Sequence, residues 1–347
     1  MSRQIFLDTV NLRPTPRLAH TEYVCHNALI EKVTGLNPDV HGAEATRRFY
    51  EAWGIDFIFG TYDGPIDWGA VGRVTDMGHA VYYEDGRDFR QPGPCPFESP
   101  EEVWEFDPVK EYGLPDFGEL VKHYQDIFDA NCAAWPEQYV TGGYYKSVVS
   151  GAIAAFGWEM LLTAAADHDK FARVLERFAN YTMYHVKAWA ETSAEVFIQH
   201  DDMVWSEGPF MHPDFYRRAI FPHFRAFWSV LKAKGKKVLF CSDGTFDMFI
   251  DDLIECGADG FIFEPSNDFD LFVRKCGRTH VIVGSKVDCR TLAFGTWEQV
   301  KAQMDATLAL AKECAGLVWA VGNHFPANIP VEMAERYISY LQANWWR

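Results

Sequence analysis

The sequence predicts a single (β/α)8 barrel, and two observations lead to that fold class. Short apolar segments that end in polar residues alternate with amphipathic segments of helical length, which is the pattern of parallel strands joined by crossover helices. No GxGxxG sequence follows any of these apolar segments. Its absence disfavours the dinucleotide-binding form of the main alternative, an open doubly wound sheet.

Seven apolar segments are the predicted strands. They span residues 56–60, 138–142, 195–200, 237–241, 260–264, 280–284 and 317–321. Helical periodicity predicts crossover helices at residues 168–194, 213–234, 247–256 and 296–314. Gly235, Gly257 and Gly277 stand just before the next strands, where helix C-caps are expected.

The remaining regions are interpreted as additions to the same barrel. Residues 1–50 carry helical signals and are expected to form an N-terminal helical extension. Residues 61–130 are expected to form an insertion of short strands and loops after the first strand. Residues 1–347 then make one domain, because no long linker, low-complexity segment or repeat divides the chain.

Charge and composition exclude several classes of partner. With 32 basic and 49 acidic residues the net charge is −17, so we expect neither nucleic acid nor an anionic membrane surface as a partner. No apolar run approaches the roughly 20 residues that span a bilayer, and the N-terminus lacks a signal-peptide pattern, so a cytoplasmic protein is expected. Eight cysteines without a CxxC pair are expected to be thiols.

Polar residues gather where the predicted strands end, which is where barrel enzymes place their chemistry. These residues are Asp63, Tyr144, Tyr145, His200, Asp201, Asp202, Cys241, Asp243, Glu264, Arg290, Asn323 and His324. Several acids at one mouth are costly unless they neutralise one another, bind a cation or titrate at shifted pKa values. Taken singly, an aspartate here is more typical of a helix cap or a loop. Glu264 directly precedes Pro265 and is a poor cap, which makes it a candidate catalytic residue.

A metal site is one way to explain this convergence. Residues two apart on a strand share a face, so Cys241 and Asp243 can point at one centre. With His324 they offer sulfur, oxygen and nitrogen ligands, a set that suits Zn²⁺ with an open fourth position. Cys241 is equally interpreted as a small buried apolar residue. His200 and Cys289 are alternative ligands.

Eight segments then occur in a specific order and spacing. They are FYEAWGIDFIF, GRVTDMGHAVYYEDG, SGAIAAFGWEMLL, QHDDMVWSEGPFMHPDFYRRAIFPHF, KVLFCSDG, GADGFIFEP, VGSKVDCRTLAFGT and VGNHFPANIP. Through them the chain, from about residue 45 to its C-terminus, resembles the uroporphyrinogen decarboxylase superfamily, which includes the cobalamin-dependent methyltransferases. The resemblance implies a (β/α)8 barrel, in agreement with the strand pattern.

The resemblance favours the methyltransferase branch. True uroporphyrinogen decarboxylases carry an N-terminal WxMRQAGR segment that this chain lacks. The methyltransferases bind zinc through a His-x-Cys-Gly strand end and a later Cys. Here Cys241 stands at the His position, Asp243 at the Cys position and His324 near the later ligand, while Glu264 matches an acidic position that would complete the zinc shell or act as an acid.

The activity that the resemblance implies is methyl transfer from a small donor, most concretely an aryl methyl ether, to a corrinoid carried by a separate protein, with zinc as Lewis acid. The implied metal ligands are Cys241, Asp243, Glu264 and His324. The implied catalytic residues are Glu264, Asp243 and Asp63. The implied substrate-binding residues are His200, Asp202, Tyr144, Trp205, Phe210, Arg290 and Trp319, of which the aromatic ones are expected to wall the pocket.

Two other functions stay open at this point. A metal-independent decarboxylase would use Asp63 or Glu264 as the acid and Arg73 or Arg290 to hold a substrate carboxylate. A non-catalytic barrel would only bind a cofactor protein. Barrels of this family often pair, so a homodimer is a further expectation.

Overall fold

The computed structural model describes residues 2–77 and 94–347. Its main sheet has seven parallel strands in the order β1-β10-β9-β8-β7-β6-β5. These strands are β1 (Ala19–His20), β5 (Gly142–Tyr144), β6 (Val196–His200), β7 (Lys237–Cys241), β8 (Gly260–Ile262), β9 (Val281–Val283) and β10 (Gly316–Trp319). Two further parallel pairs are β3 (Phe57–Ile58) with β4 (Tyr139–Val140) and β2 (Tyr23–Cys25) with β11 (His324–Pro326).

Backbone hydrogen bonds join the pair β3–β4 to the main sheet. The amide of Asp56 donates to the carbonyl of His20 at 2.8 Å, which connects β3 with β1. The amide of Tyr139 donates to the carbonyl of Asp56 at 2.8 Å, and β4 is separated from β5 by a single residue. The strands therefore follow one another around a ring, with β4 and β5 at one position. The predicted barrel fold is confirmed.

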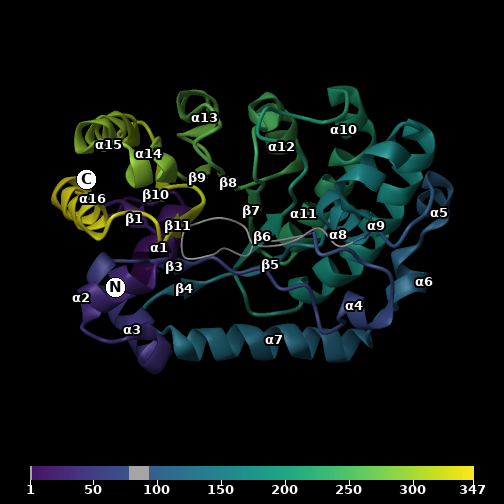
Figure 1. The fold of residues 1–347 in the computed structure, drawn as a ribbon, viewed down its shortest axis with the longest axis horizontal. Coiled ribbons are helices and arrows are strands. Elements are labelled where there is room, and N and C mark those ends of the chain that lie inside the picture. Colours follow the sequence, from purple (N-terminus) through teal and green to yellow (C-terminus); the bar gives the residue numbers. More distant parts are fainter. Residues whose placement is uncertain (1, 78–93) are drawn as a thin grey trace.

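Helices surround the strands (Figure 1). In the first half of the chain they are α1 (Ser2–Val10), α2 (Asn27–Thr34), α3 (Pro38–Trp53), α4 (Trp68–Val71), α5 (Pro100–Glu105), α6 (Pro108–Tyr112), α7 (Phe117–Ala134) and α8 (Val148–Ala165). They continue with α9 (His168–Ala190), α10 (Pro213–Ala219), α11 (Phe221–Ala233), η1 (Asp247–Phe249), α12 (Ile250–Cys256), α13 (Phe269–Cys276), α14 (Cys289–Phe294), α15 (Trp297–Ala311) and α16 (Val331–Asn344). Both ends of the chain lie on the same side of the molecule.

The predicted elements are present, with three refinements. The segment 138–142 is split into β4 and β5, and the helix expected at 213–234 is split into α10 and α11 at Ile220. The region 1–50 contains the expected helices but also β1, the first strand of the ring. The insertion 61–130 therefore follows the second strand position. The expectation of short strands in it is wrong for its described residues, which form α4, α5, α6 and most of α7 and contain no strand. Residues 78–93, including part of the GRVTDMGHAVYYEDG segment, lie outside the described residues.

The buried apolar side chains form two layers separated by the strands. The inner layer fills the barrel and contains Phe6, Val10, Ala19, Phe57, Tyr139, Val196, Ile198, Leu239, Cys241, Ile262, Val281, Val283, Val318 and Ala320. The outer layer packs between strands and helices. The alternation of side chains along each strand assigns residues to the inner or the outer layer. On β7, Leu239 and Cys241 face inward, whereas Phe240 faces the helices. Helix α1 adds Phe6 to the inner layer, stacked on Phe57 at a centroid distance of 4.4 Å.

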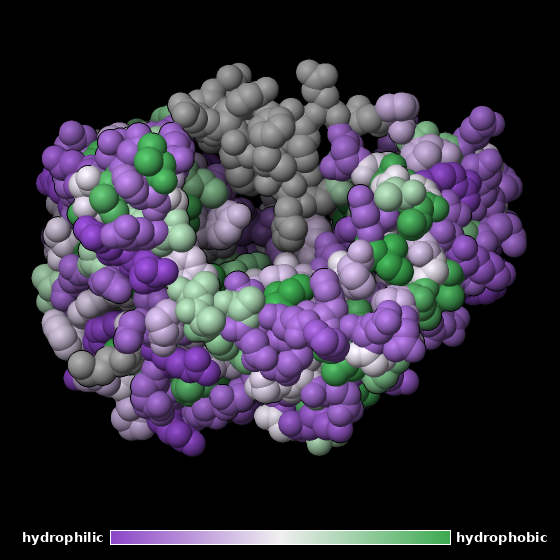
Figure 2. All heavy atoms as spheres, turned by 90° about the horizontal axis from the view of Figure 1, so that it is seen from below, coloured by the Kyte–Doolittle hydropathy of each residue, from purple (hydrophilic) through white to green (hydrophobic). Residues whose placement is uncertain are grey.

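One helix corrects an expectation about membranes. The 18 residues of α8 are long and apolar enough, by length and composition, to cross a bilayer, so the sequence does contain such a run. In the structure 67% of this helix is buried inside the protein, as in a core helix. Hydrophilic residues predominate on the face that Figure 2 shows.

A buried ion pair holds the first two strand positions together. Both terminal nitrogens of Arg17 donate to the carboxylate of Asp56, at 2.7 and 2.8 Å, and the amide of His20 donates to the same carboxylate at 2.9 Å. The guanidinium of Arg17 also lies 4.2 Å from the ring centroid of Trp345, near the C-terminus. Asp56 is fully buried, so loss of its partner would leave an uncompensated charge.

We therefore expect Arg17→Met to lower the free energy of unfolding by about 3–5 kcal/mol, because it strands the Asp56 carboxylate. Urea denaturation followed by circular dichroism measures the change. Arg13→Met, which removes a largely exposed arginine near Asp8, is the matched control and should change stability by less than about 1 kcal/mol. Equal losses in the two variants would contradict this role of Arg17.

Candidate functional site

The site lies at the C-terminal ends of the neighbouring strands β6 and β7. His200 is the last residue of β6 and stands opposite Cys241, the last residue of β7. Asp202 and Asp243 each follow two residues later. All four side chains line one cavity, so the prediction that Cys241 and Asp243 share a face is confirmed.

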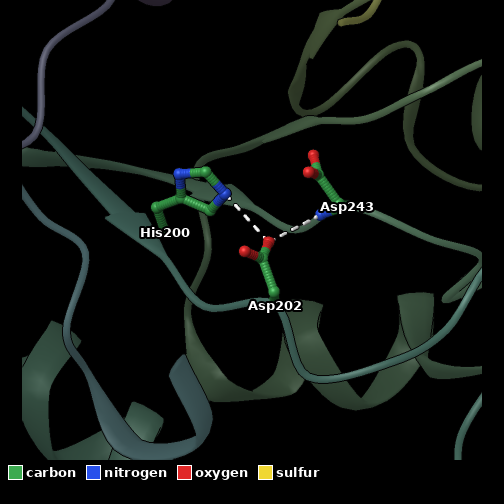
Figure 3. Close-up of side chains that lie close together, drawn as sticks. All are labelled: His200, Asp202 and Asp243. Atoms are coloured by element: carbon green, nitrogen blue, oxygen red, sulfur yellow. Dashed lines mark hydrogen bonds and ion pairs between the residues drawn. The ribbon is translucent and has the colours of Figure 1, made fainter. Parts of the chain in front are cut away.

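Asp202 is the hub of the hydrogen bonds at these strand ends. Its Oδ1 accepts from His200 Nε2 at 2.9 Å and from the amide of Asp243 at 3.0 Å (Figure 3). Its Oδ2 accepts from the hydroxyl of Tyr145 at 2.9 Å. Its own amide donates to Ser150 Oγ at 2.7 Å. These contacts hold the carboxylate in one orientation beside the imidazole.

Burial and neighbouring charges shift the pKa values of His200 and Asp202. Burial by itself lowers the pKa of His200, but Cys241 and Asp202 outweigh it and hold that pKa well above its ordinary value. Burial also acts on Asp202, yet the adjacent His200 lowers the pKa of this carboxyl far below its usual range. His200 and Asp202 are therefore an ion pair at neutral pH.

Asp243 behaves differently from Asp202. Its side chain is open to the cavity, although the barrel mouth surrounds it on the other sides. Desolvation at the barrel mouth, followed by repulsion from Asp202, raises the pKa of Asp243 to about 7. Asp243 is thus poised to gain or lose a proton near neutral pH, which suits a general acid or base.

The same residues have the spacing of a metal site. One ligand atom each from His200, Asp202 and Asp243 lies within 4.8 Å of the others, and Figure 3 shows the three residues side by side, with Asp243 joined to Asp202 through its backbone amide. The sulfur-bearing Cys241 adjoins His200 in register. Nitrogen, carboxylate oxygen and sulfur donors together suit Zn²⁺, whereas Mg²⁺ and Ca²⁺ prefer oxygen alone. The donor set therefore fits zinc.

Two adjoining cavities open at this end of the barrel. The larger has a volume of about 540 Å³, and its apolar walls come from Phe57, Phe59, Tyr62, Ile262, Val283 and Ala320. The smaller has a volume of about 360 Å³ and includes Glu264, Cys289 and Arg290. Asn323 and His324 line both. Volumes of this size accommodate a small organic molecule.

Glu264 and His324 lie beside the metal-spaced cluster but do not belong to it. Glu264 Oε2 accepts from the amide of Gly244 at 3.0 Å, and its Oε1 accepts from Asn323 Nδ2. Burial lowers the pKa of His324, which keeps this imidazole neutral at pH 7. Of the predicted ligands, Asp243 is in the cluster and Cys241 adjoins it.

The predicted aromatic walls need correction. Tyr144 and Trp319 occupy outward positions on their strands, and both are fully buried in the outer layer. Trp205 and Phe210 pack with Trp158 and do not line either cavity. Strand alternation and loop packing decide these positions, and the sequence pattern cannot show them. The aromatic residues that do line the larger cavity are Tyr23, Phe57, Phe59 and Tyr62.

Asp63 and Arg73, which are predicted to act on the substrate, form contacts outside both cavities. Asp63 accepts from the amides of Tyr145 and Lys146 and does not line either cavity. Arg73 is held by the carboxylate of Glu111 and lies outside both cavities. Neither side chain is therefore placed to contact a substrate in these cavities.

For Asp201, the expectation that an aspartate at a strand end caps a helix is confirmed. Its buried carboxylate accepts from the amides of Val148, Val149 and Ser150 at the start of α8. It therefore orients α8, which carries the Ser150 hydroxyl that meets Asp202.

Sequence reasoning passed over three residues of the site. The sequence pattern places Tyr144 and Tyr145 at one strand end and favours Tyr144 as a pocket wall, and only the direction of the side chains shows that Tyr145 contacts Asp202. Glu22 and Tyr23 follow β1, whose two residues are too short to show periodicity.

Comparisons with known proteins agree on the fold. A family model described as uroporphyrinogen decarboxylase (URO-D) matches residues 154–343, more than half of the chain. A methyltransferase from Methanosarcina mazei is similar over 99% of this chain and 98% of its own, with a TM-score of 0.65 and 17% identity. No curated protein matches the chain.

More distant structures include two other enzymes. The GH53 catalytic domain of Ignisphaera aggregans covers 94% of this chain and 97% of its own, with a TM-score of 0.40 and 12% identity. The D-psicose 3-epimerase of Clostridium cellulolyticum H10 covers 70% and 91%, with a TM-score of 0.38 and 10% identity.

The ion pair predicts how His200 titrates in the metal-free protein. Asp202→Asn removes the counter-charge, and the remaining burial should lower the pKa of His200 below that of the wild type. Nuclear magnetic resonance titration of the His200 ring protons measures this pKa. Asp126→Asn, on the exposed surface of α7, should leave it unchanged. An unaltered His200 pKa in Asp202→Asn would contradict the ion pair.

Proposed function

This chain belongs to the uroporphyrinogen decarboxylase family, and we propose that within it the protein is a zinc-dependent methyltransferase that moves a methyl group from a small donor to a corrinoid carried by a partner protein. The observation that carries the proposal is the cluster of His200, Asp202 and Asp243, with Cys241 beside it, on the wall of an open cavity. One imidazole nitrogen and two carboxylate oxygens placed together there form a donor set that zinc accepts.

The charges of the larger cavity argue against a porphyrinogen substrate. Glu22, Asp202 and Asp243 line it, and the described part of its lining contains no lysine or arginine. His200 is charged but already paired with Asp202, so a tetrapyrrole with many carboxylates would meet these acids with no unpaired cation among the described lining residues, which is unfavourable in a partly enclosed site. A small neutral or singly charged donor avoids this cost.

His200, Asp202 and Asp243 would hold the zinc. The bound metal supplies Lewis acidity, which makes the heteroatom attached to the methyl group a better leaving group. The proton that His200 Nε2 donates to Asp202 must leave when the metal binds, because a metal ligand is deprotonated at its donor atom. Tyr145 and the Asp243 amide, which already bond Asp202, would keep its carboxylate oriented.

The cavity walls favour an aryl donor. Phe57, Phe59 and Ile262 give the larger cavity apolar surface, and its volume of about 540 Å³ accommodates one substituted ring. An aryl methyl ether would lay its ring on this surface while its ether oxygen faces the polar cluster. The methyl group would then point toward the open mouth, where a corrinoid could approach.

A second candidate function is acid–base decarboxylation of a carboxylic acid without a metal. The observation in its favour is Asp243, whose pKa of about 7 lets it deliver a proton to a carbanion at neutral pH. Activity that survives exhaustive chelation would favour this candidate, whereas methyl transfer lost on chelation and restored by zinc would favour the first.

Zinc content separates the two proposed ligand sets. We expect about one zinc per chain in the wild type, and at least tenfold weaker binding in Asp202→Asn and Asp243→Asn. His324→Ala should keep its zinc if the cluster holds the metal, and should lose it if Cys241, Asp243, Glu264 and His324 are the ligands. Elemental analysis after dialysis against a weak chelator measures the metal, with Asp126→Asn as control.

Methyl transfer is then assayed with anisole derivatives and reduced free cobalamin, whose absorbance reports methylation. Wild type should methylate cobalamin, and the two variants that lose zinc should not. Zinc-free wild type that turns over at the full rate would overturn the Lewis-acid role.

A further inference from the structure

The smaller cavity is a second part of the same site. It shares Asn323 and His324 with the larger cavity, so a ligand in one lies next to a ligand in the other. Its volume of about 360 Å³ holds part of a small organic molecule. Its lining differs from that of the larger cavity in charge.

Among the described residues that line either cavity, Arg290 is the one side chain with a permanent positive charge. It is exposed and makes no ion pair within residues 2–77 and 94–347.

The two acidic residues that line the smaller cavity, Asp288 and Glu264, already accept hydrogen bonds from within the protein. Asp288 Oδ1 accepts from the amide of Arg290 at 2.7 Å, as the N-cap of α14. Glu264 accepts from the amide of Gly244 and from Asn323. Both carboxylates keep their negative charge, but each is held by amide donors and neither forms an ion pair with Arg290 among the described residues, so the guanidinium is available to an anion from outside the chain.

The rest of the lining suits an anion with an apolar body. The side-chain oxygen of Asn328 is buried and has no hydrogen-bond partner among the described residues. Rotation of this amide by half a turn would present its NH2 group to a bound oxygen. Phe294, on the same wall, is 79% exposed, a large apolar surface that a ligand could cover.

We propose that the smaller cavity binds the carboxylate of an organic anion through Arg290. The same anion is then the methyl donor, a step that rests on the proposed function. A guanidinium binds a carboxylate with two parallel hydrogen bonds, which gives geometric specificity that a lysine lacks. The donor is then an ether whose carboxylate lies in the smaller cavity and whose methyl-bearing end lies against the larger one.

The test measures binding without turnover. Purified full-length protein is titrated with 4-methoxybenzoate, and with neutral 4-methoxybenzyl alcohol as the matched probe, by isothermal calorimetry. We expect the carboxylate to bind the wild type more tightly than the alcohol, and Arg290→Gln to weaken only the carboxylate, by roughly ten- to hundredfold. Arg290→Lys should retain part of the affinity. Arg274→Gln, an exposed arginine of α13 near Asp268, is the control with the same change in charge and should bind like the wild type.

Three outcomes would overturn the inference: wild type that binds no 4-methoxybenzoate at millimolar concentration, equal affinity for acid and alcohol, or unchanged affinity in Arg290→Gln. The same titration on Asp243→Asn separates this inference from the proposed function. If Asp243→Asn still binds the carboxylate, and this binding depends on Arg290, the carboxylate site is supported. If the wild type also transfers no methyl group, the proposed methyltransferase function is overturned.

Discussion

Closure of the barrel depends on Asp56, which connects three strand positions at once. Its amide and carbonyl pair with β1 and β4, and its carboxylate is held by Arg17 from the segment before β1. Because the ring is closed, the carboxyl ends of all its strands meet at one mouth. Glu22 and Tyr23, just after β1, thereby come to line the same cavity as His200 on β6.

Within that mouth, electrostatics decide which acids can react. Burying several carboxylates together is costly, and each one here is stabilised in a different way. Asp201 is bonded by the amides of α8, Asp202 pairs with His200, and Glu264 is held by Gly244 and Asn323. Asp243 is left facing the cavity with its pKa raised to about 7, so a cation or a proton at this position would relieve its repulsion from Asp202. Asp243 is therefore both a candidate metal ligand and the candidate acid.

The two cavities offer different groups to a ligand. The larger cavity presents acids and apolar rings, and the smaller presents Arg290. A donor that satisfied both would be anchored at its anionic end and activated at its other end, so that binding energy far from the reacting atoms positions the methyl group. Family membership indicates the barrel, whereas the chemistry must be argued from these side chains, because one fold serves many activities.

The sequence by itself determined the barrel, seven of its strand positions and the strand ends at which polar residues gather, because hydrophobic periodicity and the order of elements are local properties. It also placed Cys241 and Asp243 on one face. Only the tertiary structure decided that Tyr145, and not Tyr144, meets Asp202, and that Trp319 faces the helices. It also grouped His200 and Asp202 with Asp243, since the register between β6 and β7 sets which strand ends touch. Register and side-chain direction arise from contacts between distant segments, and no local pattern records them.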